Sequence, residues 1–418
     1  MEIKEYVIQK AKQAKEASRR MSFISTVIKD NALRVMAAAL IDNADIIIAE
    51  NSIDMKNGEA AGLNKTLLDR LLLNNKRIKD MADGLVEIAG LQDPIGETIR
   101  AWKTPDNLSI GQVRVPLGVI GIIYEARPNV TADAAGLCIK SGNSVVLRGG
   151  SEAVNSNKAI VKTISDAGIK AGLPDGFLQY IENTDREAVK VLMKLNEYID
   201  VLIPRGGAGL IKTVIENSTV PVIETGVGNC HVFVDESADF NMARDIVINA
   251  KTQRPGVCNA MEKLLVHASV AEDFLPYLKE KLDDYNVELR GCKRTAEILK
   301  DIKEACEEDW STEYLDLIMA VKIVDSLDEA IDHIYKYSSK HSEAIITENY
   351  SNAQRFLNEV DAAAVYVNAS TRFTDGAQFG FGGEIGISTQ KLHARGPMGI
   401  KELTSTKYII YGQGQVRK

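Results

Sequence analysis

A regular alternation of strand-like and helix-like segments most restricts how this chain can fold. Between residues 129 and 224, helical stretches alternate with the short apolar runs SVVLR, FLQYIEN, DVLIP and VPVIE. A second alternation, from residue 238 to about residue 368, contains the strand candidates KLLVHA, AVKIVD, EAIITE and AAVYVN. Short strands separated by longer helices are typical of βαβ units with a parallel sheet. The sequence therefore predicts two α/β domains.

The segments outside the two alternations have other patterns. Apolar residues recur at helical spacing in residues 3–91, which predicts a helical opening segment. Residues 108–124, LSIGQVRVPLGVIGIIY, carry β-branched residues in short runs and predict a strand or hairpin, and the glycine-rich tail ends in a strand-like TSTKYIIY. No apolar run reaches the roughly 20 residues that span a bilayer, and the N-terminus lacks the core of a secretory signal. We expect a cytoplasmic protein with no membrane partner.

Charge and cysteine content exclude several classes of site. The 50 Lys+Arg against 58 Asp+Glu give a net charge of −8, which disfavours a nucleic-acid partner. An odd number of cysteines without a CxxC pair fits neither a disulfide framework nor a zinc cluster, so no metal site is expected. If a cysteine has a function, it acts as a single thiol. The five are Cys138, Cys230, Cys258, Cys292 and Cys306.

Arginine placement departs from chance. With 31 Gly and 10 Pro in 418 residues, about two of the 19 arginines should directly precede Gly or Pro, yet six do. An arginine beside a flexible or kinked backbone can point its guanidinium at a phosphate or carboxylate. Any one of them could equally cap a surface loop, but the set favours an anionic ligand. The six are Arg127, Arg148, Arg205, Arg254, Arg290 and Arg395.

Two glycine pairs each follow a predicted strand and precede a predicted helix. Glycine at that place lets the backbone approach a pyrophosphate and exposes N–H groups of the helix N-terminus. Neither pair belongs to a GxGxxG fingerprint, and ordinary tight turns explain them equally well. The two segments are Arg148-Gly149-Gly150 and Arg205-Gly206-Gly207.

One cysteine has the surroundings of a reactive thiol. Cys258 lies in RPGVCNA, where Pro255 and Gly256 predict a loop before a strand and Arg254 would favour the thiolate. Most cysteines are inert buried side chains, and the alternative, Cys230 beside His231, is weaker because neighbours in a strand point to opposite faces. We therefore rank Cys258 first.

The segments around these residues resemble the aldehyde dehydrogenase superfamily, and within it the gamma-glutamyl phosphate reductases of proline biosynthesis. The resemblance implies an aldehyde-dehydrogenase-like α/β fold with two Rossmann-like domains and a small β oligomerisation element. By it, residues 1–107 and 126–228 form the cofactor-binding domain, residues 229–378 the catalytic domain, and residues 108–125 and 379–418 the oligomerisation element. The matching stretches are residues 115–153, 203–211, 222–235, 253–267, 379–399 and the SSKHSEAI run that ends at Ile345.

The resemblance also implies roles for single residues. Cys258 falls on the nucleophile of the family, and Asn129 falls on the side-chain amide that completes the oxyanion hole. Arg148 occupies the position that binds the adenosine ribose, and Ser151 stands where relatives that prefer NAD have a glutamate. Glu313 falls on the glutamate that contacts the nicotinamide ribose. Because Ser151 replaces that carboxylate, we expect NADPH as the cofactor.

The implied reaction is NADPH-dependent reduction of L-glutamyl 5-phosphate to L-glutamate 5-semialdehyde and phosphate through a cysteine thioester. Gly206 and Gly207 join the expected cofactor site, and Arg254 and Arg395 are expected to bind the substrate. The resemblance further implies a homo-oligomer and functional coupling to the kinase that makes the substrate.

One position departs from the hydrolytic relatives. Glu224 falls on their water-activating glutamate, but Thr225-Gly226-Val227 replaces the Leu-Gly-Gly-Lys run that follows it there. We therefore do not assign Glu224 as a base. Two alternatives stay open, a hydrolytic NAD-dependent aldehyde dehydrogenase and a non-catalytic binding protein on the same scaffold.

Overall fold

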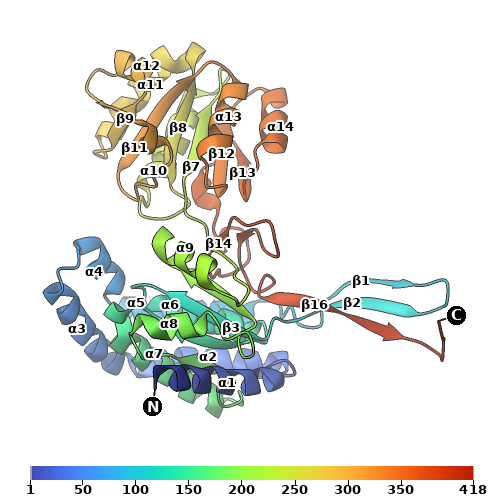
Figure 1. Ribbon diagram of the computed structural model, residues 1–418. Helices are drawn as coiled ribbons and strands as arrows, with labels where there is room; N and C mark the ends of the chain where they lie inside the picture. The colour runs from blue at the N-terminus through green and yellow to red at the C-terminus, as the bar shows by residue number, and fades with distance from the viewer. Residues whose placement is uncertain (1, 418) are drawn as a thin grey trace. The chain divides into compact units, whose positions relative to one another are not determined.

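The computed structural model describes residues 2–417, and the chain divides into two compact units. Unit 1 comprises Met1–Glu224, Gly380–Gly386 and Met398–Lys418, and unit 2 comprises Thr225–Phe379 and Ile387–Pro397. Each unit contains a parallel sheet with helices packed on it (Figure 1), which confirms the two predicted α/β domains.

Unit 1 is built on a four-stranded parallel sheet with the order β5-β4-β3-β6. Its strands are β3 (Val119–Tyr124), β4 (Ser144–Arg148), β5 (Leu178–Tyr180) and β6 (Val201–Arg205). Every residue of β3 and β4 is buried, which explains why these segments read as continuous apolar runs. The carboxyl ends of parallel strands meet at one edge of a sheet, so the loops after β4 and β6 emerge on either side of β3.

Helices cover this sheet, and the predicted helical opening segment is confirmed. Asparagine side chains begin two of its helices, because Asn64 accepts a hydrogen bond from the N–H of Leu67 and Asn74 accepts one from Arg77. The helices of unit 1 are α1 (Ile3–Met21), α2 (Thr26–Asp42), α3 (Ala44–Ala60), α4 (Lys65–Leu71), α5 (Asn75–Gly90), α6 (Asn129–Lys140), η1 (Ser151–Ala153), α7 (Val154–Lys170), α8 (Arg186–Leu192) and α9 (Ala208–Asn217).

A separate three-stranded antiparallel sheet, here called the arm, projects from the rest of unit 1 (Figure 1). It consists of β1 (Thr98–Lys103), β2 (Ser109–Pro116) and β16 (Thr404–Tyr411), with β2 in the middle. The strand predicted in the tail is therefore present. It pairs with β2 along its whole length.

The structure corrects the prediction that residues 108–125 belong to one β element. Gly118, with φ of 123°, separates β2 from β3, and Val119–Tyr124 enters the parallel sheet instead of pairing with β2. The physical reason is burial, since all six residues of β3 are buried whereas β2 is mostly half-buried. The predicted strand VPVIE is reduced to one bridge, between Leu202 and Val222, because its proline has no N–H to pair.

Unit 2 contains a seven-stranded sheet with the order β10-β9-β11-β8-β7-β12-β13, and all of its pairings are parallel. The four predicted strands of the second alternation are β8, β11, β12 and β13. The strand in which Cys230 and His231 were placed is β7, while β9 and β10 were not predicted. The strands are β7 (Cys230–Val234), β8 (Met261–His267), β9 (Glu288–Gly291), β10 (Lys303–Glu304), β11 (Ile318–Val324), β12 (Ser342–Ile346) and β13 (Ala364–Val367).

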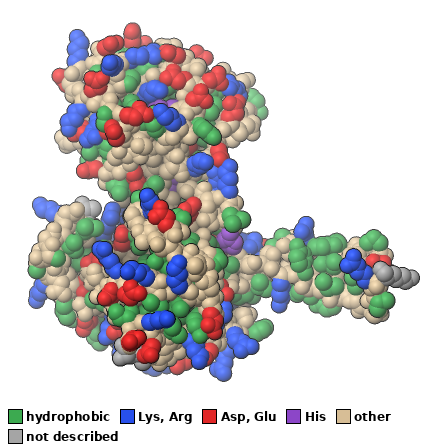
Figure 2. All heavy atoms as spheres, viewed as in Figure 1, with side chains coloured by type: hydrophobic (Ala, Val, Ile, Leu, Met, Phe, Trp, Pro, Cys, Tyr) green, Lys and Arg blue, Asp and Glu red, His purple; other side chains and the backbone are tan. Residues whose placement is uncertain are grey.

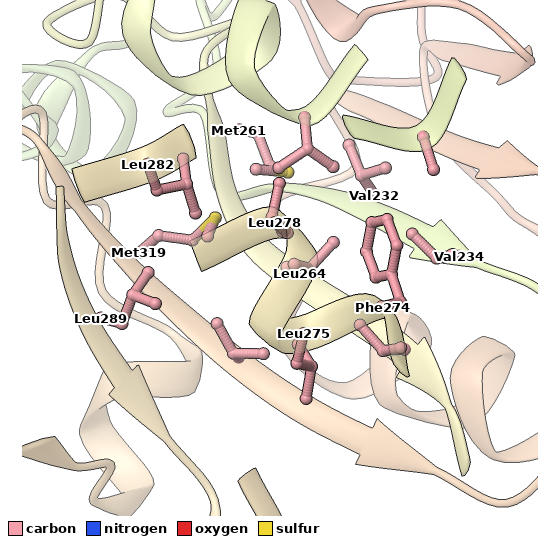
Figure 3. Packing of buried hydrophobic residues seen from close by; sticks show 14 of the residues in the cluster. Val232, Val234, Met261, Leu264, Phe274, Leu275, Leu278, Leu282, Leu289 and Met319 are labelled. Carbon is pink, nitrogen blue, oxygen red and sulfur yellow. The ribbon is translucent and has the colours of Figure 1, made fainter. Parts of the chain in front are cut away.

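The core of unit 2 lies between this sheet and its helices. Figure 3 shows Phe274 and Leu278 of α11 packed near Val232 of β7 and Leu264 of β8, all four of them buried. Such packing leaves the loops at the strand ends to carry function. The remaining elements of unit 2 are α10 (Phe240–Thr252), α11 (Ala268–Asp283), α12 (Lys293–Ile298), η2 (Glu307–Trp310), α13 (Leu327–Tyr337), α14 (Tyr350–Glu359), η3 (Thr371–Phe373), β14 (Ile387–Ser388) and β15 (Gly396–Pro397).

Candidate functional site

Cys258 lies on the segment that joins α10 to β8, residues 253–260, which we call the thiol loop. As the sequence predicts, this is a loop directly before a strand, and the thiol is half-buried. One hydrogen bond lies within the loop, where the N–H of Ala260 donates to the carbonyl of Val257 at 3.1 Å. A second hydrogen bond joins the loop to β7, where Sγ of Cys230 donates to the carbonyl of Cys258 at 3.2 Å.

A second segment of unit 2 packs tightly against the thiol loop. A Cβ at Gly228 would lie 1.6 Å from the carbonyl oxygen of Cys258, so only glycine permits this approach. The N–H of Gly228 donates to Oε1 of Glu313 at 2.6 Å. Glu313 therefore holds the backbone that presses on Cys258, and burial raises the pKa of this carboxyl. Its predicted contact with a nicotinamide ribose stays a prediction.

The alternative pair of Cys230 and His231 is not formed. His231 lies with its Nδ1 3.0 Å from Oε2 of Glu343, while Sγ of Cys230 lies 3.8 Å from Nδ1 of His341. The two residues follow each other in β7, so their side chains point to opposite faces. Burial raises the pKa of Cys230 and also that of Cys138 within α6. Both shifts disfavour a thiolate at these cysteines.

The two arginines predicted to bind substrate have different surroundings. Arg254 is exposed on the thiol loop, four residues before the thiol in the chain. Arg395 instead forms an ion pair with Asp361, at 2.8 Å, and Lys391 reaches the same carboxylate at 2.7 Å. These two cations hold the pKa of Asp361 below its usual range. Of the two predicted substrate-binding arginines, only Arg254 therefore lies on the loop that carries Cys258.

Sequence reasoning missed Arg372, which contacts the thiol loop from η3. Its Nε donates to Oε1 of Gln253 at 2.8 Å, and its Nη1 donates to Oδ1 of Asn259. One guanidinium therefore joins the residues on both sides of Cys258. The arginine pattern could not find it, because Arg372 precedes Phe373 and not glycine or proline.

In unit 1, Asn129 is the first residue of α6 and its side chain is exposed. Its Nδ2 donates to Oδ2 of Asp133 at 3.1 Å. Burial raises the pKa of Asp133 to about 6, and the hydrogen bond from Asn129 opposes that shift. The Asp133 carboxyl thus orients the Asn129 amide.

The loop after β4 holds the residues predicted to select the cofactor. Arg148 is largely buried, and its guanidinium donates to the carbonyls of Gly149 at 2.9 Å and Thr184 at 2.8 Å. Burial lowers its pKa, and its buried Nε has no hydrogen-bond partner. Ser151 is exposed at the start of η1. The neighbouring Glu152 turns back, accepting the N–H of Ala126 at 2.8 Å.

The loop after β6 presents the second glycine pair. The N–H of Gly207 donates to Oε2 of Glu125 at 2.8 Å, and a Cβ at Gly206 would meet the same carboxyl group at 2.6 Å. No side chain caps α9, which starts directly after this turn. A glycine turn at a helix N-terminus, together with an arginine at the end of β4 on the other side of β3, fits a dinucleotide phosphate. Glu125 was not predicted from the sequence.

Residues 2–417 carry neither a metal cluster nor a membrane-spanning helix. There, no three His, Cys, Asp or Glu side chains are grouped so that they could hold a metal ion. No helix in this described part is long and apolar enough to cross a membrane.

Comparisons with known proteins give a consistent result. The model of the aldehyde dehydrogenase family matches residues 3–297 and 291–409. The gamma-glutamyl phosphate reductase of Clostridium novyi is 68% identical over 417 residues, covering 100% of both chains. The crystal structure of gamma-glutamyl phosphate reductase from Thermotoga maritima has a TM-score of 0.96 at 54% identity, covering 99% of this chain and 100% of that one. An acetylating aldehyde dehydrogenase from Geobacillus thermoglucosidasius, 19% identical with a TM-score of 0.72, shares the fold. The predicted fold class is confirmed.

Proposed function

The chain belongs to the gamma-glutamyl phosphate reductases of the aldehyde dehydrogenase family, and on that premise we propose that it reduces L-glutamyl 5-phosphate with NADPH in proline biosynthesis. The observation that carries the proposal is the setting of Cys258. Its half-buried thiol stands on a loop fixed from two sides, by Cys230 and by Gly228. A fixed, partly exposed thiol suits a nucleophile that must meet an acyl carbon in one geometry.

The chemistry follows from the residues of the chain. The thiolate of Cys258 attacks the acyl carbon, a C–S bond forms, and phosphate leaves with the electrons of the C–O bond. Arg254, four residues away in the chain, favours the thiolate and the anionic substrate. The family resemblance assigns the oxyanion to the amide of Asn129 and a backbone N–H. The resulting thioester accepts a hydride, and the thiohemiacetal collapses to the semialdehyde and the free thiol.

The cofactor supplies that hydride when it is bound. In this chain Gly206 and Gly207 would hold its phosphates at the start of α9, and Arg148 and Ser151 would bind the adenosine end. Glu313 is assigned to the nicotinamide ribose by the family resemblance. Arg395 stays a proposed substrate ligand, with its ion pair to Asp361 as a competing role. We also propose that the protein is cytoplasmic and that it is functionally coupled to the kinase that makes its substrate.

Phosphate dependence tests the proposed reaction. The purified protein should oxidise L-glutamate 5-semialdehyde with NADP only when inorganic phosphate is present, because phosphate must cleave the thioester. Activity that does not need phosphate would favour the hydrolytic alternative. No turnover of either cofactor would favour a non-catalytic protein.

Cofactor choice is expected to depend on Ser151 and Arg148. A 2′-phosphate needs a cation and is repelled by a carboxylate, so the wild type should prefer NADPH to NADH. Ser151→Glu should shift the preference toward NADH by about tenfold, and Arg148→Ala should weaken NADPH more than NADH. The measurement is the ratio of kcat/KM for the two cofactors.

The ratio is informative because Arg148 also supports the structure. Losing its bonds to the carbonyls of Gly149 and Thr184 should loosen the loop for both cofactors alike and cancel in the ratio. Ser151→Gln serves as the matched control for Ser151→Glu, since it adds a side chain of the same length without the charge and should shift the ratio much less. A wild-type preference for NADH, or the same ratio in all variants, would remove these two residues from the cofactor site.

We further propose that the arm pairs subunits into at least a dimer. Figure 2 shows apolar side chains exposed along it, and β1 and β16 are edge strands with open backbone groups. Light scattering at micromolar concentration should give a mass of at least twice the 45.8 kDa of one chain. A single-chain mass would refute this. The exposed apolar residues are Ile99, Trp102, Tyr408, Ile410 and Tyr411.

A further inference from the structure

η3 is fastened to the thiol loop by a set of hydrogen bonds that centre on Asn259. The hydroxyl of Thr371 donates to the carbonyl of Asn259 at 2.8 Å, and Nδ2 of Asn259 donates to the carbonyl of Thr374 at 2.8 Å. Asn259 directly follows Cys258 and is buried. The backbone that carries Arg372 is thus held at a fixed place beside the thiol.

The guanidinium of Arg372 is half-buried in unit 2, and a second arginine is among the groups that act on it. The charged or ionisable groups that act on it are Arg254, Asp375 and the thiols of Cys258 and Cys230. Burial lowers the pKa of Arg372, and repulsion by Arg254 lowers it further. Asp375 is the one carboxylate among these groups. An anion placed here would relieve that repulsion.

The bonds of Arg372 also fix its direction. Gln253 and Asn259 precede and follow Cys258, and each supplies an oxygen to a different nitrogen of the same guanidinium. A guanidinium held in this way loses little entropy when it takes a ligand. Arg395, by comparison, is engaged with Asp361.

We propose that Arg372 is a substrate-binding residue that holds the phosphoryl group of the acyl phosphate beside Cys258 and receives it as inorganic phosphate. The inference rests on the proposed function. As the C–S bond forms and the C–O bond to phosphorus breaks, the leaving oxygen takes the electron pair. Arg372 stabilises that developing charge, and no electron is exchanged with a cofactor in this step.

Alkylation of the thiol tests the anion site without any substrate or cofactor. Iodoacetate is anionic and iodoacetamide neutral, so the ratio of their rates at Cys258, followed by peptide mass spectrometry, reports a nearby cation. Cys306 is the internal reference, because it is exposed and its Sγ lies 3.2 Å from the carboxylate of Asp309. In the wild type the ratio should be higher at Cys258 than at Cys306. Inorganic phosphate should slow the iodoacetate reaction at Cys258 only.

Arg372→Gln should lower the iodoacetate-to-iodoacetamide ratio at Cys258 about tenfold, and Arg372→Lys should retain part of it. Arg355→Gln removes an exposed arginine of α14 that pairs with Asp328 and Glu359, and should change nothing. In semialdehyde oxidation, Arg372→Gln should also raise the KM for phosphate about tenfold while the KM for NADP stays constant.

The outcomes separate this inference from the proposed function. A merely structural role for Arg372 would slow both reagents equally, and an unchanged ratio in Arg372→Gln would overturn the inference. Absence of phosphate protection in the wild type would overturn it without any variant. Failure of the proposed function would appear as missing phosphate-dependent oxidation, whereas the alkylation ratio does not depend on turnover.

Discussion

Replacing Cys258 with serine is expected to lower the rate of semialdehyde formation by about 1000-fold or more while the protein still folds. A serine hydroxyl is a far weaker nucleophile than a thiolate near neutral pH, and its ester would accept a hydride poorly. The bond from Cys230 to the thiol loop should survive the substitution, because it is accepted by the backbone carbonyl of residue 258. The measurements are kcat/KM and the thermal unfolding midpoint.

Two cysteines serve as controls for this variant. Cys306→Ser changes an exposed thiol and should leave kcat/KM unchanged. Cys230→Ser should retain most of the activity, since a hydroxyl can still donate to the carbonyl of Cys258. If Cys258→Ser kept more than a few per cent of the activity, the thioester mechanism would be wrong. If Cys230→Ser were as inactive as Cys258→Ser, the nucleophile would have to be reassigned.

Gly228→Ala is expected to lower activity strongly, although it leaves every reactive group in place. The added Cβ would lie 1.6 Å from the carbonyl oxygen of Cys258, so backbone must move on one side or the other. A displacement of about 1 Å at a reacting atom costs about 100-fold in rate. We expect kcat/KM to fall by that factor and the labelling rate of Cys258 by neutral iodoacetamide to change with it.

The matched control for this variant is Gly90→Ala. Gly90 is exposed at the end of α5 and has nothing within 4 Å of its ideal Cβ, so activity and stability should stay close to those of the wild type. A Gly228→Ala protein with normal kcat/KM would mean that the two segments can separate without moving the thiol. The tight packing would then have no part in catalysis.

The sequence predicted those parts of the fold in which local pattern and burial agree. The alternation of strands and helices was predicted correctly because each strand is a short apolar run between amphipathic helices. Val119–Tyr124 was assigned to the wrong sheet because its β-branched residues suit an arm strand and a buried central strand equally well. Only its pairing with β4 and β6, which both lie outside the segment itself, decides between the two sheets.

The candidate site shows the same limit. Pro255 and Gly256 mark the loop of Cys258 locally, so the thiol could be singled out from its neighbours in the chain. Arg372 could not be singled out, because its place beside the thiol depends on hydrogen bonds to oxygens of Gln253 and Asn259, which lie more than a hundred positions earlier in the chain. In the same way, nothing near Arg395 in the sequence indicates its ion pair with Asp361.

The order of the strands in the arm has a consequence for synthesis of the protein. β2 is made early, but its second neighbour, β16, comes from the opposite end of the described chain, after all of unit 2 has been translated. At roughly 5–20 residues per second, that edge of β2 waits about 15–60 s with its N–H and C=O groups unpaired by protein. Nascent chains on one polysome bring such open edges close together. The arm thus presents, during synthesis, an open strand edge that a chaperone on the ribosome would protect.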